Sequence, residues 1–501
     1  MEELPEKLIL NRKELPEKFI MNKLKPMDIP IPDPNTIKVN TTILVYDLTN
    51  ASANRTITLP VHGYVSYPYY VKWGDGTEKQ IISNDVYPSR TLARGKKYRI
   101  KIKGKIWHYG DPYFIVSSNI YLTEVIKLGA TNLSGAFYGA TNLVKVPKRL
   151  PKGVYNLSGM FAECTNFNYP INDWDTSQVT NMSSMFYFAR NFNQPLDKWD
   201  VSNVDYMNYI FGNATSFNQP LDKWNVSKVK NMSRMFYIAS NFNQPLDKWD
   251  TSQVTNMSHM FEDATSFNQP LNNWNVSGVQ LMDSMFRVAT SFNQPLNNWD
   301  VSGVQQMVYM FHGATSFNQP LNNWDVSGVK NMSYMFQSAI SFNQPLNNWV
   351  LSTSNTDLSY MFNNATSFNQ PLNNWDVSGV QLMDSMFRVA TSFNQPLNNW
   401  DVSSVQLMRY MFRGATSFNQ PLHLWNLTNI LDSSYMLDYC GMSQYNYQLT
   451  LVGWYKIFHN PYHSPISFGA KGLAYNSSFS DVNTAHTFFN PIGDIDINFQ
   501  N

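Results

Sequence analysis

The chain has almost no net charge, no long apolar run and only two cysteines. Lys and Arg number 37 against 36 Asp and Glu, so the basic excess that non-specific nucleic-acid binding needs is missing, and no nucleic-acid partner is expected. No stretch of about 18 apolar residues occurs, so neither a transmembrane helix nor membrane insertion is predicted. Aromatic residues make up 15% of the chain, whereas disordered chains are poor in them, so most of the chain is expected to fold.

Tryptophan recurs at an almost constant interval. The row consists of Trp174, Trp199, Trp224, Trp249, Trp274, Trp299, Trp324, Trp349, Trp375, Trp400 and Trp425. Every step is 25 residues except that from Trp349 to Trp375, which is 26. A fixed period in this range is typical of a solenoid, in which one structural unit is stacked many times. The array is therefore predicted to form an extended surface.

Each repeat carries two Met, a Phe and an Ala with the spacing i, i+3, i+4, i+7, first at positions 182, 185, 186 and 189. This spacing lies on one face of a helix, so about two helical turns are predicted in each layer. Asn181 or Ser183 can cap the start of that helix. Such a helix is too short to be stable alone and would depend on stacking.

The segment SFNQPLNNW that follows in each repeat is predicted to be extended and to stack as a parallel sheet. Its proline cannot donate a ladder hydrogen bond, so the strands should be short. Identical residues would then lie above one another, and Asn272, Asn297, Asn322 and Asn347 are predicted to form a ladder of side-chain amides. The alternative is that this uniform polar side binds a repeating ligand such as a glycan.

The two cysteines stand three residues after the motif aromatic position, in the first and last copies, where the copies between carry alanine. Cys164 and Cys440 are therefore predicted to be small core residues. They are separated by eleven layers, or about 50 Å at roughly 4.8 Å per layer, so no disulfide between them is predicted.

The chain is predicted to have four parts. They are an N-terminal tail and linker (1–38), a small β domain (39–126), the solenoid (129–450) and a C-terminal cap or appendix (451–501). Inside the solenoid, the 25 residues from Gly278 to Ser302 recur unchanged from Gly379 to Ser403, 101 residues later. Four repeats were therefore copied as a block, which suits a structural or binding surface better than an active site of fixed geometry.

The β domain carries strand-like segments and a Gly74-Asp75-Gly76 turn. The segments YVKWGDGT (70–77) and TLARGKKYRIKIKG (91–104) resemble the PKD domain. This resemblance implies an all-β, immunoglobulin-like sandwich for residues 39–126. Asp75 is predicted to cap the turn rather than to act as a catalytic group.

The repeat pattern Met-x-x-Met-Phe-x-x-Ala-Thr-x-Phe-Asn-x-Pro-Leu-x-x-Trp resembles the BspA-like leucine-rich repeat family, which includes the mycoplasma surface-protein repeat domain of unknown function. The resemblance implies an α/β repeat solenoid with short helices and stacked parallel short strands. Members with known roles are mostly surface adhesins or binding proteins. Similar arrays occur in large DNA viruses. Because no secretory signal is predicted, the expected location is intracellular or virion-associated.

Two positions of the predicted helix vary most among the copies, and both should face solvent. They lie two residues before and one residue after the motif aromatic. The candidate partner-binding residues at these positions are Tyr209, Arg234, His259, Arg287, Tyr309, Tyr334, Tyr360, Arg388, Tyr410 and Arg413. Tyr and Arg are favoured anchors in protein interfaces. The alternative is that these are tolerant surface positions without a partner.

No catalytic constellation, cofactor motif or metal site is predicted. The Asp or Asn after each Trp, such as Asp200, suggests calcium, but Val350 breaks the row and turn capping is favoured. Pro461 lies between His459 and His463, which argues against a helical metal site there. The chain is therefore expected not to be an enzyme. The leading hypothesis is a scaffold for protein–protein binding, and the alternative is a surface or virion adhesin that recognises glycans or host surface proteins.

Overall fold

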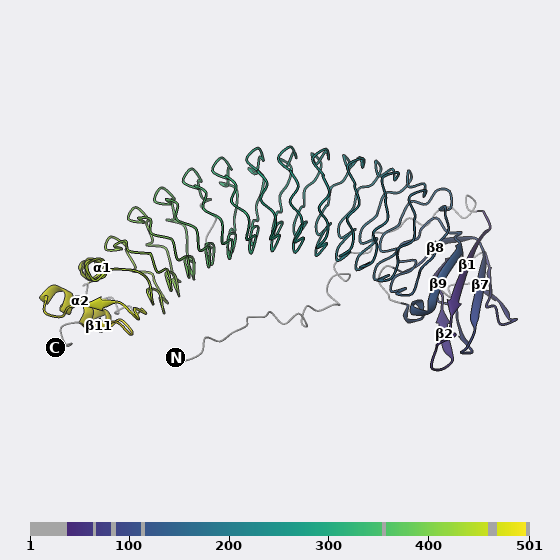
Figure 1. Cartoon of the computed structure of the whole chain (residues 1–501), viewed down its shortest axis with the longest axis horizontal. Coiled ribbons are helices and arrows are strands. Elements are labelled where there is room, and N and C mark those ends of the chain that lie inside the picture. The colour runs from purple at the N-terminus through teal and green to yellow at the C-terminus, as the bar shows by residue number, and fades with distance from the viewer. Residues whose placement is uncertain are drawn as a thin grey trace. The chain divides into compact units, whose positions relative to one another are not determined.

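The computed structural model describes residues 38–63, 67–81, 87–111, 116–352, 357–458 and 468–496 (Figure 1). The chain divides into two compact units, Met1–Pro147 with Pro151–Cys164, and Lys148–Leu150 with Thr165–Asn501. The predicted tail lies outside the described residues except for Lys38, and so do His459 and His463.

The N-terminal unit is mostly sheet. Its elements are β1 (Asn40–Asp47), β2 (Arg55–Thr58), β3 (Val61–Gly63), β4 (Tyr69–Lys72), β5 (Glu78–Ile81), β6 (Ser89–Leu92), β7 (Lys97–Gly104), β8 (Ile106–Tyr109), the 3₁₀ helix η1 (Ser117–Tyr121) and β9 (Leu122–Lys127). Five strands form one antiparallel sheet in the order β5-β4-β7-β1-β9, and β2–β6 and β3–β8 pair separately. Every second residue of β7 is buried, as its alternating sequence predicts. This pairing does not confirm an immunoglobulin-like sandwich.

The turn between β4 and β5 is held by Asp75, as predicted. Its carboxylate accepts the backbone N–H of Thr77 at 3.0 Å and the Arg90 Nε–H at 2.6 Å. Partial burial opposes its charge, but the hydrogen bonds from Thr77 and Arg90 lower the pKa of Asp75 to about 2. The carboxylate is therefore occupied in shaping the turn.

The regular repeats contain no helix among the described residues, so the predicted α/β solenoid of short helices and strands is wrong. In the first regular coil, the N–H groups at positions 185, 187 and 189 donate to carbonyls three residues earlier. The N–H groups between them leave the coil, as from Ser184 to the Asn208 carbonyl at 2.8 Å and from Phe186 to Ile210 at 2.9 Å. An α-helix would direct each of them to its own residue i−4. Here they join each coil to the next.

Left-handed residues explain why the helix does not form. Ser184 and Phe188 have φ of +57° and +58°, and the equivalent positions of most later coils are also left-handed. Each stands third in a four-residue turn, where a positive φ reverses the chain. A series of such turns buries positions i, i+3, i+4 and i+7 as a helix does. The hydrophobic spacing therefore predicted the buried residues correctly and the backbone incorrectly.

The predicted parallel strands of the SFNQPLNNW segment are also absent from the described coils. Parallel bridges occur instead at the start of most turn segments, as between Asn181 and Tyr206. In the extended segment, an asparagine side chain replaces the missing backbone ladder: the Asn243 N–H donates to the Asn218 Oδ1 at 3.0 Å. Proline in every copy prevents continuous backbone pairing here.

The coil interior consists of stacked rows of identical side chains, as predicted. The Trp, Phe, Leu and Met rows are buried along the array. Phe186 stacks on Phe211 of the next coil with ring centroids 5.7 Å apart. The Trp224 indole N–H donates to the Leu196 carbonyl of the coil before at 3.0 Å, and later coils repeat this bond. Cys164 and Cys440 are buried and free, which confirms their prediction as core residues.

The C-terminal region continues the coil pattern with different elements, α1 (Gln444–Phe458), β10 (Ala474–Tyr475), α2 (Ser480–Phe489) and β11 (Ile495–Asp496). In α1, the Trp454 indole N–H donates to the Leu422 carbonyl at 2.8 Å, in the manner of a repeat tryptophan. The N–H groups of Leu437 and Tyr439 donate to the carbonyls of Gly469 and Lys471. These bonds satisfy the donors of the last regular coil.

Candidate interaction surface

All ten candidate residues lie on the stretch of consecutive turns, which we call the turn face, and not on a helix face as predicted. Each of the ten side chains is half-buried. Two positions in every coil form this surface. The first is the left-handed residue two before the motif aromatic, as at Tyr209, and the second is the residue one after it, as at Arg287. Coil stacking places the equivalent residues of successive coils side by side.

Tyrosine rings stack along the turn face. The ring centroids of Tyr309 and Tyr334 are 4.5 Å apart, and those of Tyr334 and Tyr360 are 4.6 Å apart. After Ser385 interrupts the row, Tyr410 and Tyr435 stack at 4.8 Å with nearly parallel planes. These contacts explain why the rings are half-buried, and they hold the side chains in fixed positions.

Arginines lie over the tyrosines. The Arg234 guanidinium is 5.2 Å from the Tyr209 ring centroid, and that of Arg287 is 6.0 Å from Tyr309. Arg388 and Arg413 each lie 5.5 Å from the ring centroid of Tyr410. Guanidinium groups within about 6 Å of an aromatic face are attracted to its electrons. The sequence-predicted Tyr and Arg residues are therefore brought together as one surface.

An acidic residue that the candidate set omitted lies within this surface. Glu262 is buried, and its carboxylate contacts His259 and Arg287. Burial opposes its charge, but His259 and Arg287 outweigh burial and lower the pKa of Glu262 below its usual range. The available signal was a Glu 25 residues before an Arg at the same repeat position.

His312 follows Arg287 in the same row of coil positions. Its pKa falls to about 4 because burial disfavours its charge and the neighbouring Arg287 repels a second positive charge. At neutral pH the cluster therefore combines the Glu262–Arg287 ion pair with a neutral histidine.

The uniform asparagine side of the array is a hydrogen-bond ladder. The Asn318 Oδ1 accepts the Asn343 N–H and the Gln344 Nε2–H, each at 3.0 Å, and most other coils repeat this pair. The row named from the sequence behaves differently, since the Asn272 Oδ1 accepts the backbone N–H of Asn298 at 3.0 Å. The ladder therefore runs through the Asn-Gln dipeptide, four residues before the predicted asparagine in the same segment.

Except at Val350, the Asp or Asn after each repeat tryptophan caps a turn. The Asp200 Oδ1 accepts the Ser202 N–H at 3.0 Å, and Asp300, Asp325 and their equivalents accept the same bond. Throughout the described ranges, no group of three or more His, Cys, Asp or Glu residues is arranged to hold a metal ion.

The repeat region matches the family described as "Mycoplasma protein of unknown function, DUF285". The matched segments are residues 131–244, 220–308, 271–356 and 352–450, which together span more than half of the chain. The chain belongs to this family. The resemblance to the mycoplasma-type repeats is thereby confirmed, whereas the PKD resemblance of residues 39–126 stays a prediction. A search of curated proteins finds no match to the chain.

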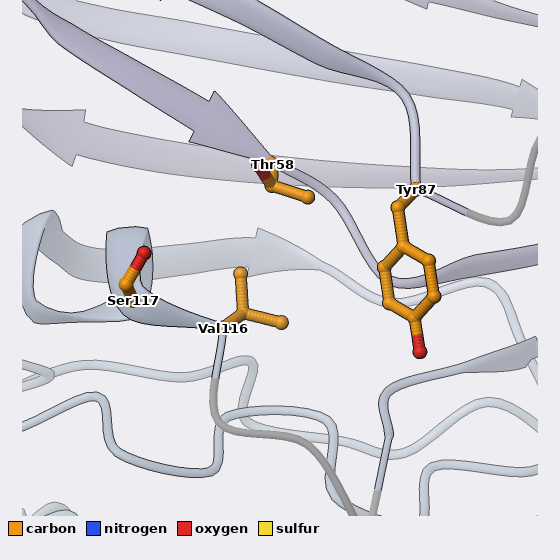
Figure 2. Close-up of a pocket in the computed structure, with 4 residues that line it drawn as sticks. All are labelled: Thr58, Tyr87, Val116 and Ser117. Atoms are coloured by element: carbon orange, nitrogen blue, oxygen red, sulfur yellow. The ribbon is translucent and has the colours of Figure 1, made fainter.

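Outside the DUF285 repeats, the N-terminal unit has a partly open pocket of about 440 Å³ lined by Thr58, Tyr87, Val116 and Ser117 (Figure 2). The Tyr87 hydroxyl donates to the carboxylate of Asp111. No convergent acid, base or metal-binding set is found among the pocket's lining residues. Among the described residues of this DUF285 protein, no helix has the length and apolar character to span a membrane.

Proposed function

We propose that the chain is a non-enzymatic repeat scaffold that binds a protein partner through its turn face. The observation that carries this proposal is the use of bulky side chains at left-handed positions. Tyr209, Tyr309, Tyr334 and Tyr360 all have φ near +60°. For residues with a side chain, this conformation costs about 1–2 kcal/mol. Glycine would adopt it without that cost.

A second row of left-handed residues lies two positions after the motif aromatic. It shows that the repeat accepts small residues in this conformation. It carries Asn213, Gly313, Asn364 and Gly414. The first left-handed row lies two positions before the motif aromatic. From residue 184 onward, no position of this row is glycine or asparagine, and six of its positions are tyrosine. Ring stacking offsets part of the cost, but it also fixes Tyr and Arg side chains, which are enriched at protein interfaces.

The test is partner capture with the full chain from a lysate of the organism that encodes it. The variant changes Tyr309, Tyr334, Tyr360 and Tyr410 to serine, which the first row already contains as Ser284. The matched control changes four exposed asparagines on another side of the coils, Asn298, Asn323, Asn348 and Asn374, to serine.

We expect mass spectrometry to identify proteins that the native chain and the control retain and the tyrosine variant loses. Circular dichroism spectra of all three proteins should agree. Equal capture by the tyrosine variant would place the binding surface elsewhere. If no protein is captured and arrayed glycans bind instead, the adhesin alternative would replace this proposal.

A further inference from the structure

The turn face contains two copies of one sequence block in different electrostatic surroundings. Gly278–Ser302 and Gly379–Ser403 are identical and carry Arg287 and Arg388 at the same position. In the coil before Arg287 the equivalent residue is Glu262, which pairs with it. In the coil before Arg388 the equivalent residue is Asn363, which has no charge. The chain therefore holds a neutralised copy and an unneutralised copy of one arginine.

The coil after Arg388 adds a second arginine. The Arg388 and Arg413 guanidinium groups each lie 5.5 Å from the Tyr410 ring centroid, so they are at most about 11 Å apart, twice that distance. Arg413 also lies 5.8 Å from the Tyr435 centroid. We call these four residues, Arg388, Tyr410, Arg413 and Tyr435, the Arg388 patch. Two positive charges this close repel each other, because the separation is comparable to the screening length at physiological salt.

No described carboxylate forms an ion pair with either arginine of the patch. Asp384 and Asp432 pair with Arg409, and Asp438 is buried and accepts the backbone N–H of Lys471 at 3.0 Å. The N–H donors of Arg388 and Arg413 also form no side-chain hydrogen bond within the described residues. Both arginines therefore present unused donors beside aromatic surface.

The patch is accessible. Both arginines and Tyr410 are half-buried, while 47% of Tyr435 is exposed. Alternate side chains of an extended peptide lie on one side at about 6.7 Å spacing, which is within the reach of both guanidinium groups. Carboxylates on such residues could each accept charge-assisted hydrogen bonds from one arginine.

We propose that the Arg388 patch binds an extended acidic segment of the partner protein. This inference rests on the proposed function and assigns the partner's chemistry at that surface. The equivalent site at Arg287 does not bind such a segment, because Glu262 already pairs with its guanidinium and His312 stands where the patch has Arg413.

The experiment measures binding of a fluorescent hexaglutamate peptide to the purified full chain by anisotropy at low salt. Four variants are compared with the native chain: Asn363→Glu, Asn363→Gln, the double change Arg388→Gln with Arg413→Gln, and Arg234→Gln. Asn363→Glu supplies the carboxylate that neutralises the equivalent arginine in the other block. Asn363→Gln is its uncharged control, and Arg234→Gln removes an arginine outside the patch.

We expect Asn363→Glu and the double arginine variant to weaken peptide binding by about tenfold or more, since each removes charge-assisted bonds. Asn363→Gln and Arg234→Gln should bind within about twofold of the native chain. A hexalysine peptide should not bind. Because the proposed function is tested by lysate capture, failure of the peptide alone would leave that function standing.

The converse variant tests gain of function. Glu262→Asn combined with His312→Arg should free Arg287, supply the second arginine that the Arg388 patch has at position 413, and raise the number of hexaglutamate peptides bound per chain from one to two. Absence of peptide binding, equal binding to the native and Asn363→Glu chains, or a chain with both changes that gains no second site would each overturn the inference. Binding of a sulfated oligosaccharide without binding of hexaglutamate would overturn the assignment to an acidic protein segment.

Discussion

At the scale of single residues, the left-handed positions decide the backbone of the repeat. Burial of the Met, Phe and Ala positions could be predicted from their spacing, because any chain that turns every three to four residues buries such a set. The sign of φ at the turn positions could not be predicted from this spacing. Ser184 and Phe188 do not belong to the residue types that usually mark left-handed conformation, and their φ depends on bonds to the next coil.

Three β-branched residues, Ile238, Val288 and Val389, are strained at these positions. Val288 and Val389 have φ of +55° and +58°, where the next coils carry Gly313 and Gly414. Val288→Asn and Val389→Asn should each raise the free energy of unfolding by about 1 kcal/mol, because asparagine tolerates the left-handed region. Urea denaturation measures this gain. Val308→Asn, at a position without positive φ, is the control and should give no gain.

A buried histidine predicts how stability depends on pH. His108 lies in the N-terminal unit, where it stacks on His62 with ring centroids 4.4 Å apart and contacts the Ser134 carbonyl at 3.1 Å. Burial, and then the charge of His62, lower the pKa of His108 to about 3. The unfolded chain therefore binds more protons than the folded chain between pH 6.5 and 3, and stability falls as pH falls through this window.

Each pH unit within that window should cost the N-terminal unit up to about 1.4 kcal/mol through His108. Urea denaturation at pH 7, 6 and 5, followed by the signal of the N-terminal tryptophans, tests this. His108→Gln should flatten the dependence while it keeps a donor for Ser134. An unchanged slope in that variant would show that another group causes the loss.

At the scale of the coil, the turn segments and the extended segments are joined to the next coil by different groups. Turn segments bond to the next coil through the backbone, whereas the extended segments bond through asparagine amides. The sequence could predict that asparagines form a ladder, because identical polar residues stack. It could not show which asparagine forms it, since the copies have several asparagines each and the choice depends on which one faces the neighbouring N–H groups.

Removal of one ladder acceptor should break two hydrogen bonds at once. Asn318→Ala leaves the Asn343 N–H and the Gln344 Nε2–H without their acceptor, so we expect a loss of about 1–3 kcal/mol in the free energy of unfolding. Asn323→Ala, at an exposed position of the same coil, should change it by less than about 0.5 kcal/mol. Equal effects of the two changes in urea denaturation would contradict this assignment of the ladder.

The candidate surface was only partly predictable at this scale. Repetition in the sequence selected the variable positions, and the structure brings the ten residues together on the turn face. The ion pair of Glu262 and Arg287 was missed, because pairing across coils depends on the stacking register rather than on nearness in the sequence.

At the scale of the whole molecule, the array is a sum of equivalent coils, so its length should be adjustable. Deletion of residues 303–403 joins Ser302 to Ser404 and leaves one copy of the duplicated block. In a stacked array each unit contacts mainly its neighbours, and the new neighbours have the same block sequence. We expect the shortened chain to fold cooperatively with a smaller denaturant m-value.

The control deletes residues 303–391, which joins Ser302 to Ser392 and so brings residues of different repeat positions together. It should unfold less cooperatively than the in-register deletion, because the coils at its junction no longer match. Circular dichroism and urea denaturation measure the outcome. Loss of folding in the in-register deletion as well would show that the coils depend on contacts beyond their immediate neighbours.

The bonds between coils also give the array an electrical direction. In successive turn segments, alternate N–H groups point toward the C-terminal end and the carbonyls they meet point toward the N-terminal end. Each peptide group is a dipole of about 3.5 D, and these forward bonds outnumber the backbone bonds that run the other way, such as that from Asp205 to Thr180. The net dipole therefore places a positive pole at the C-terminal end of the array, where the Arg388 patch lies. A chain with formal net charge of only +1 is thus polarised along its stack, and its last coils attract anions more strongly than the charge balance suggests.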